Sequence, residues 1–341
     1  LILVGTSGSM WDVFFERESG PHDESLLELI DAVETDAVTG DLLADHATRL
    51  SKRLGYPVTC LLIDYARDEA GQAALLGNLA NVLNDGEHVT IDVTHSFRHL
   101  PMLALVAARF LARVKKVDVD EIYYGAYDMK DESSGDVPVI RLKGMLRMLD
   151  WVDALSSYDK DGDYGVFASL LTEDGMVPDK AGKLRTAAFR ERVNHIKGAR
   201  QELTVSLNAI SEHDGPLGGL FKGELERRIA WARRPERSQQ ELALAASYLE
   251  RRDYLRTAIF LLEGLVPQEV FRRKGNDGDY TERNEARKAL ADGNRSFKTL
   301  DLLRNSLAHG SRSDNREVAA LLTNEKSLQE TLARFARELP Q

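Results

Sequence analysis

The sequence predicts an α/β, Rossmann-like N-terminal domain with a mostly parallel sheet, followed by an all-α C-terminal domain. Over the first 140 residues or so, short apolar runs alternate with helical patterns, which is the arrangement of βαβ crossovers. After about residue 143 the strand pattern stops, and from residue 185 onward nearly every segment has helical spacing. The length of 341 residues also suits two domains.

Five apolar runs predict the strands of the first domain. The first, Leu1–Gly5, ends at a glycine and has the continuous apolar character of a buried parallel strand. The other four cover residues 58–64, 88–94, 120–126 and 137–142. Helical patterns lie between them at residues 24–34, 40–54, 68–83 and 98–115. Because ligand sites on such sheets gather at the carboxyl ends of the strands, the turns that follow the strands are the first candidates for a site.

The remainder of the chain is predicted to be helical. Residues 159–184 are rich in Gly, Asp and Lys, which predicts a loop or small insertion. Helices are expected beyond it at residues 187–212, 217–233, 238–250, 253–272, 280–291, 296–309 and 326–338. We therefore expect a Rossmann-like domain at 1–150, a linker or insertion at 151–185 and a helical domain at 186–341.

Composition restricts the class of protein. Hydrophobic residues make up 43% and charged residues 29%, which excludes collagen, a disordered tail and a disulfide scaffold. Cys60 is the single cysteine and cannot form an internal disulfide, as is typical of a reducing cytoplasm. The longest apolar stretch, residues 101–112, is interrupted by Arg109 and is too short to span a bilayer. We expect a cytoplasmic protein with no secretion signal and no membrane partner.

Charge is distributed unevenly along the chain. Residues 1–150 carry 14 Lys and Arg against 25 Asp and Glu, whereas the remainder is close to neutral. Proteins that coat nucleic acid are usually strongly basic, so stable, sequence-independent binding to long DNA or RNA is not expected. This composition still allows a locally basic cleft in the second half of the chain. The charge asymmetry supports two domains with different tasks.

The turn after the first strand, Gly5-Thr-Ser-Gly-Ser9, has the residues of an anion-binding loop. Its glycines allow a tight turn that exposes backbone N–H groups, and its hydroxyls add donors that suit phosphate oxygens. The spacing matches neither the G-x-G-x-x-G nor the Walker pattern, so ordinary dinucleotide or ATP binding is not indicated. The alternative is a turn whose serines cap the next segment.

The end of the 88–94 run carries a denser group of polar residues. It reads Asp92-Val-Thr-His-Ser-Phe-Arg98, followed by His99-Leu-Pro101. Thr94, Ser96 and Arg98 could donate to an anion with help from the following helix N-terminus, whereas Asp92 is expected to orient a neighbour. The alternative for His95 is a capping or surface histidine.

A late helical segment, Leu300–Gly310, holds an arginine and a histidine five residues apart. On a helix, the offset between Arg304 and His309 is about 140°, so the two tips can converge on one groove, and Gly310 is expected to end the helix. Histidine can exchange protons near neutral pH, and a guanidinium can hold the negative charge of a phosphodiester transition state. Asn305 could orient either group. The same spacing at Arg190 and His195 is interpreted as charges on a solvated helix face.

No metal site is predicted. The chain has no cysteine cluster, and its acidic turn at residues 275–279 lacks the downstream ligands of an EF-hand. Cys60 is expected in the core. A set of arginines could flank an RNA path but more often forms an exposed helix face: residues 227, 228, 233, 234, 237, 251 and 252.

Together, these residues resemble the CRISPR-associated ancillary ribonucleases that join a CARF sensor domain to a HEPN nuclease domain. The resemblance lies in Gly5-Thr-Ser, in Asp92–Pro101 and in Arg304–His309. The middle segment looks like the D-x-T-H-x-x-R signature of one CARF branch, with Ser96 where glycine is common. The last looks like the R-x4-H signature of HEPN domains. The resemblance covers essentially the whole chain.

The resemblance implies a homodimer of the type III CRISPR antiviral defence. Its paired CARF domains, here residues 1–150, would bind a cyclic oligoadenylate, most commonly the tetra-adenylate. Binding would activate the HEPN domains, here residues 186–341, as a metal-independent endoribonuclease on single-stranded RNA. The ligand loops would comprise Thr6, Ser7, Gly8 and Ser9, and Thr94, His95, Ser96 and Arg98. The catalytic residues would be Arg304 and His309, assisted by Asn305, in an active site shared by two protomers.

Two other functions stay open. One is a non-catalytic cyclic-nucleotide sensor whose helical half only dimerises or contacts a partner. The other is a sensor that also degrades its cyclic oligoadenylate, as a ring nuclease, by means of the 2′-hydroxyls of the ligand.

Overall fold

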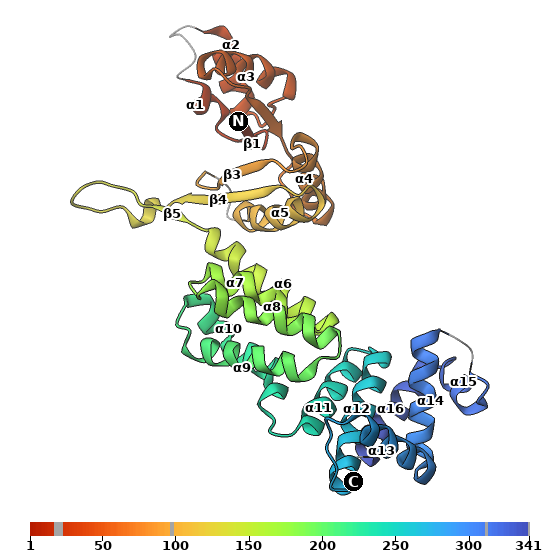
Figure 1. The fold of residues 1–341 in the computed structure, drawn as a ribbon. Helices are drawn as coiled ribbons and strands as arrows, with labels where there is room; N and C mark the ends of the chain where they lie inside the picture. The colour runs from red at the N-terminus through yellow and green to blue at the C-terminus, as the bar shows by residue number, and fades with distance from the viewer. Residues whose placement is uncertain (17–22, 96–98, 311–312, 340–341) are drawn as a thin grey trace. The chain divides into compact units, whose positions relative to one another are not determined.

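The computed structural model of the protein describes residues 1–16, 23–95, 99–310 and 313–339 (Figure 1). It divides into two compact units, Leu1–Leu146 and Arg147–Gln341. The first unit contains strands and helices, and the second is helical. This confirms the predicted fold class, a parallel-rich α/β region followed by an all-α region. Within the described residues, none of the helices is both long enough and apolar enough to cross a lipid bilayer.

The strands of the first unit form two sheets. They are β1 (Ile2–Gly5), β2 (Thr59–Leu62), β3 (His88–Asp92), β4 (Asp118–Gly125) and β5 (Val139–Arg141). β1 pairs in parallel with β2. β3 pairs in parallel with β4, and β4 pairs in antiparallel fashion with β5. All five predicted strands are present, but among the described residues they do not join into the single sheet that the sequence led us to expect.

Local signals in the sequence set the limits of the helices in the first unit. These are α1 (Trp11–Phe15), α2 (Glu24–Glu34), α3 (Gly40–Leu54), α4 (Glu69–Val82) and α5 (Leu100–Val114). The Thr39 hydroxyl accepts a hydrogen bond at the start of α3, which ends at Gly55 with φ 77°. Asp68 starts α4 by accepting from the Gly71 N–H at 2.8 Å. Pro101 lies in the first turn of α5, where its missing N–H has no helical partner to lose.

Each sheet of the first unit has its own apolar core. Trp11, Phe15, Leu29 and Leu43 are buried beside β1 and β2. A smaller cluster around β3 and β4 includes Val93 and Ile122, together with residues of α5. One apolar cluster therefore anchors β1 and β2, and the other anchors β3 and β4.

The second unit is a helical bundle around one large core. Its helices are α6 (Lys143–Asp161, which begins in the first unit), α7 (Phe167–Glu173), α8 (Pro178–Arg192), α9 (Ile196–Glu212), α10 (Pro216–Arg228), α11 (Arg237–Glu250), α12 (Tyr254–Arg272), α13 (Tyr280–Gly293), α14 (Arg295–His309), α15 (Arg316–Leu321) and α16 (Glu325–Glu338). Trp151, Tyr164, Phe167, Phe260 and Phe297 are at most 1% exposed within this core. α8 packs on α9, and α11 on α12 (Figure 1).

The structure corrects two expectations for this unit. Residues 151–185 do not form a linker or loop, because α6, α7 and most of α8 cover them. Their high content of Gly, Asp and Lys conceals Trp151 and Phe167, which bury these helices in the core. The helix expected at 187–212 is two helices, since Asn194 has a left-handed conformation (φ 57°) and the chain turns between α8 and α9.

Candidate functional site

The loop after β1 is closed by contacts between its own residues. The Thr6 N–H donates to Ser9 Oγ at 2.8 Å, and the Thr6 carbonyl accepts from the Trp11 indole at 2.8 Å. The Thr6 side chain is only 1% exposed, and its hydroxyl lies 3.2 Å from that of Ser9. Thr6 and Ser9 therefore shape the loop, while Gly8 is exposed at its tip.

A carboxylate that sequence reasoning missed lies against this loop. The hydroxyls of Ser7 and Tyr65 both donate to Asp36 Oδ1, the latter at 2.7 Å. These two hydrogen bonds, with Ser7 first, hold the pKa of the Asp36 carboxyl below its ordinary value. A Cβ on Gly8 would lie 2.8 Å from the Tyr65 hydroxyl and 3.0 Å from Asp36 Oδ1, so a larger residue would displace one of these side-chain ends.

The loop after β3 ties two strand ends together. The Thr94 N–H donates to Asp92 Oδ1 at 2.8 Å, which confirms the expectation that Asp92 orients a neighbour. The Thr94 hydroxyl accepts from the Gly125 N–H at the end of β4, also at 2.8 Å. His95 is exposed. Ser96 and Arg98, the other two candidates in this loop, lie outside the described residues.

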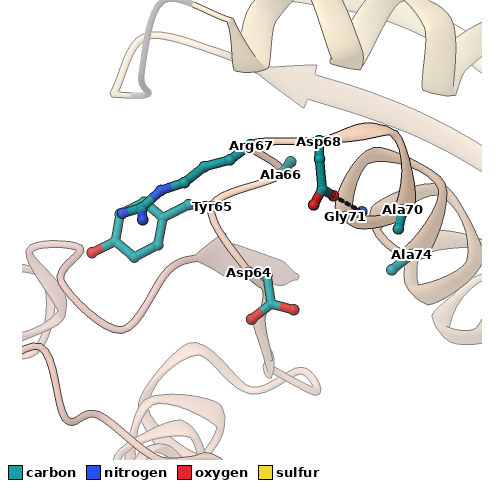
Figure 2. Close-up of a pocket in the computed structure, with 8 residues that line it drawn as sticks. All are labelled: Asp64, Tyr65, Ala66, Arg67, Asp68, Ala70, Gly71 and Ala74. Atoms are coloured by element: carbon teal, nitrogen blue, oxygen red, sulfur yellow. Dashed lines mark hydrogen bonds between the residues drawn. The ribbon is translucent and has the colours of Figure 1, made fainter.

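Tyr65 links the two candidate loops, although β1 and β3 belong to different sheets. Its hydroxyl reaches Asp36 beside the first loop, and its carbonyl oxygen lies 3.0 Å from Nε2 of His99, which follows the second loop. A cavity opens next to it, where the chain leaves β2 and enters α4 (Figure 2). The signal that could have found Tyr65 is its position directly after the predicted strand at 58–64, at the same end of the strands as the loops already considered.

In the helical unit, the predicted catalytic residues lie on the last turns of α14. Arg304 keeps 25% of its side chain exposed, and its Nη2 lies 3.7 Å from Asp301 Oδ1. Asn305 is half-buried, and His309 is exposed as the last residue of the helix. Gly310 follows in the left-handed conformation (φ 60°), which confirms the predicted end of the helix. The arginine and the histidine are thus on one helix end that is open to solvent.

Arg190 and His195, the second pair with this spacing, have side-chain tips that lie close together. A Cβ on Gly198 would lie 2.7 Å from both Arg190 Nη1 and His195 Nδ1, so the two tips meet over this buried glycine. Arg190 is also paired with Glu202 at 3.1 Å. The tight turn at Asn194, which the sequence did not predict, produces this convergence.

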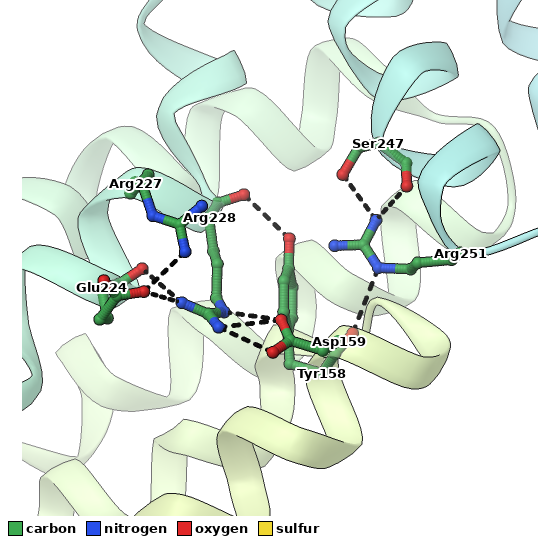
Figure 3. A network of polar contacts seen from close by, with 7 residues as sticks. All are labelled: Tyr158, Asp159, Glu224, Arg227, Arg228, Ser247 and Arg251. Atoms are coloured by element: carbon green, nitrogen blue, oxygen red, sulfur yellow. Dashed lines mark hydrogen bonds and ion pairs between the residues drawn. The ribbon is translucent and has the colours of Figure 1, made fainter.

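Two of the arginines considered for an RNA path are engaged within the helical unit (Figure 3). Arg228, whose side chain is 9% exposed, pairs with Asp159 at 2.9 Å and with Glu224. The Arg251 guanidinium lies 4.5 Å above the Tyr158 ring and donates to the Tyr158 carbonyl. These arginines connect α6 to α10 and α11, which is a structural role.

One group of side chains has the composition of a metal site. His88 Nδ1 lies 3.6 Å from Asp118 and 3.3 Å from Asp120, at the amino ends of β3 and β4. All three side chains are exposed, and they lie at the opposite end of these strands from the Thr94 loop. Exposed acidic groups of this kind are common without a metal, and the cluster takes no part in the site described here.

These features define a class: an α/β unit with polar loops at its strand ends, joined to a helical unit. Comparison with known proteins gives the particular likeness. Residues 62–128 match the family model of the CARF domain of the CRISPR system endoribonuclease Csx1. The chain is also 27% identical, over 232 residues, to the CRISPR-associated protein MJ1674 of Methanocaldococcus jannaschii. That alignment covers 62% of this chain and 36% of the relative, so the chain spans about a third of the relative's length.

The matched segment contains much of the geometry described above. It begins at the last residue of β2 and includes the cavity, β3, the Thr94 loop, α5 and β4. The likeness to the Csx1 CARF domain therefore rests on the segment that carries the strand ends of β2 and β3.

Proposed function

We propose that the protein is a cyclic-oligoadenylate-activated endoribonuclease of type III CRISPR defence. The observation that carries this proposal is the CARF match over residues 62–128 in a chain whose helical unit presents Arg304 and His309 on one exposed helix end. The first unit would sense the ligand and the second would cut single-stranded RNA in the cytoplasm. Arg190 is held by the shorter ion pair, 3.1 Å to Glu202 against 3.7 Å from Arg304 to Asp301, so the Arg190 pair is the less suitable candidate for cleavage.

Ligand binding is assigned to the strand-end loops of the first unit. Gly8 leaves the tip of the first loop open, and the Thr94 hydroxyl, which accepts from Gly125, still has its own proton to donate to a phosphate oxygen. Residues of the sequence motif that the structure does not describe, Ser96 and Arg98, would complete this loop. The activator is expected to be cyclic tetra-adenylate.

RNA cleavage is assigned to the end of α14, without metal. The 2′-hydroxyl of the substrate would attack the adjacent phosphorus and lose its proton, while the bond from phosphorus to the 5′-oxygen breaks and that oxygen gains a proton. His309 can take up or deliver one of these protons. The guanidinium of Arg304 would hold the charge on the phosphate oxygens, with Asn305 orienting the phosphate. One helix end supplies a single set of these groups, so we propose that a homodimer brings two sets together.

Cleavage of labelled single-stranded RNA in EDTA, with and without cyclic tetra-adenylate, tests this function. We expect cleavage only with the activator, and we expect Arg304→Ala and His309→Ala each to lower the rate at least 100-fold. Arg190→Ala and His195→Ala are the matched controls, because they remove the same residue types at the same spacing and should leave cleavage near the wild-type rate.

A different distribution of effects would point to other functions. Wild-type binding of the ring without RNA cleavage would favour the non-catalytic sensor. Loss of cleavage in the Arg190 and His195 variants, with Arg304 and His309 variants unaffected, would move the active site to α8 and α9. Chromatography of the ring after incubation would reveal ring-nuclease activity.

A further inference from the structure

We propose that the cavity following β2 is a ribonucleotide subsite, in which Asp64 accepts hydrogen bonds from ribose hydroxyls and Arg67 binds a phosphate. This inference deepens the ligand-sensing function proposed above and rests on it. The cavity has a volume of about 500 Å³ and is lined by residues 64–68 and the first turns of α4 as far as Ala74 (Figure 2). That volume lies within the range of small-ligand sites.

The Asp64 carboxylate is placed to accept a hydrogen bond from a ligand. It lies two residues beyond β2, it is exposed, and no residue that the structure describes donates a hydrogen bond to its carboxylate. Asp68 on the same cavity differs, since one of its oxygens accepts from the Gly71 N–H at 2.8 Å. In parallel βαβ units, a carboxylate at the end of the second strand is in position to bind ribose hydroxyls of a nucleotide held at the end of the first. β1 and β2 are parallel neighbours of this kind.

Arg67 is held ready for an anion. Its guanidinium lies 4.6 Å above the Tyr65 ring, and Tyr65 is fixed in turn by its hydrogen bond to Asp36. Ala66, between them, is buried with a left-handed backbone (φ 49°), which places these two neighbouring side chains on one side of the turn (Figure 2). Within the described part of the chain, no carboxylate forms an ion pair with Arg67. A stacked guanidinium keeps its N–H edges free for a phosphate.

A ligand bound in this cavity would affect both the loop after β1 and the loop after β3, because Tyr65 contacts residues beside each of them. Tyr65 contacts Asp36, which holds Ser7 in the first loop, and its carbonyl lies against His99 beyond the second loop. A ligand phosphate drawn to Arg67 would thus act on the residue that joins the loops. The subsite also supplies a cation to a unit whose sequence is strongly acidic.

The test is isothermal titration of the full chain with cyclic tetra-adenylate and with its all-2′-deoxy counterpart. We expect the wild type to bind the ribose ring at least tenfold more tightly. Asp64→Asn should weaken binding of the ribose ring about tenfold and leave binding of the deoxy ring unchanged. Arg67→Ala should weaken both rings about tenfold, because both carry the phosphates. Asp68→Asn is the matched control: asparagine still caps α4, and both affinities should stay at their wild-type values.

The outcomes separate the subsite from the wider function. Equal wild-type affinity for the two rings, which needs no variant, or an Asp64→Asn effect of the same size on both rings, overturns the subsite while ligand sensing stands. If the wild type binds neither ring, the sensing function fails and the subsite fails with it. Far-UV circular dichroism of each variant shows whether it has folded.

Discussion

Thr94→Val tests whether the loop after β3 is held to β4 as the structure indicates. Valine has the shape of threonine and retains the methyl group, which packs against Gly125: a Cβ added there would lie 2.9 Å from it. It removes the oxygen that accepts from the Gly125 N–H at 2.8 Å, and it leaves the bond from the Thr94 N–H to Asp92 in place. The only direct loss is therefore one acceptor for one backbone donor.

The size of that loss follows from the environment. A backbone donor left without a partner costs about 1–3 kcal/mol, and because this site is only half-buried we expect about 1–2 kcal/mol. For a unit of this size, each kcal/mol lowers Tm by about 2–4 °C. Thr94→Ser keeps the hydroxyl and is the matched control. It should recover most of the lost stability.

Hydrogen–deuterium exchange of peptides covering residues 118–125 reports on the same bond directly. We expect faster exchange at the end of β4 in Thr94→Val and near wild-type exchange in Thr94→Ser. The hydroxyl also carries the proton that we assign to a ligand phosphate, so only the valine variant should lose affinity for cyclic tetra-adenylate. Unchanged exchange and unchanged Tm in Thr94→Val would refute the proposed tie between the two strand ends.

Two further predictions concern the pH dependence of stability in the helical unit. Burial raises the pKa of Glu241 to about 7, so the folded state binds the Glu241 proton more tightly than the unfolded chain does. The free energy of unfolding should therefore fall by roughly 3 kcal/mol as pH rises from about 4.5 to 7. Urea titration of Glu241→Gln should not show this fall. Burial alone would raise the pKa of Asp174, but hydrogen bonds from the Gly218 N–H and from His213 outweigh burial and leave the pKa low. The contribution of the Asp174 carboxylate to folding stability should therefore be lost as pH falls below about 4. Asp174→Ala should cost about 3 kcal/mol at pH 7, and equal thermal stability of this variant and the wild type would contradict that role.

Features that depend on neighbouring residues were predictable from the sequence. The end of α14 at Gly310 follows from a glycine placed after the last apolar residue, and the role of Asp92 follows from strand alternation and the turn that comes next. The strands, too, appear where apolar runs are bounded by turn residues. At Gly310 and at Asp92 the decisive contact joins residues close together in the chain.

Features that depend on distant partners were not predictable in this way. Asp36 stands 29 residues from both Ser7 and Tyr65, and no local pattern marks it as their common acceptor. The meeting of Arg190 and His195 depends on a left-handed residue, Asn194, inside what the pattern shows as one continuous helix. Polar composition likewise concealed the helices at 151–185, since only a few large apolar side chains anchor them.

The first unit is acidic, but the environment of each of its carboxylates near the strand ends is compatible with a polyanionic ligand. Asp92 and Asp68 each accept from a backbone N–H of a loop or helix start, and Asp36 Oδ1 accepts from two hydroxyls, so one oxygen of each carboxylate is engaged by donors of the protein itself. Exposed charges further than about 10 Å from a ligand are largely screened at 0.1 M salt. The field at the strand ends is then set by the nearest groups, which are backbone donors, the start of α4 and Arg67. Asp64 differs from these three because neither of its oxygens accepts a hydrogen bond from a residue that the structure describes, and a ribose hydroxyl can donate to it whereas a phosphate cannot.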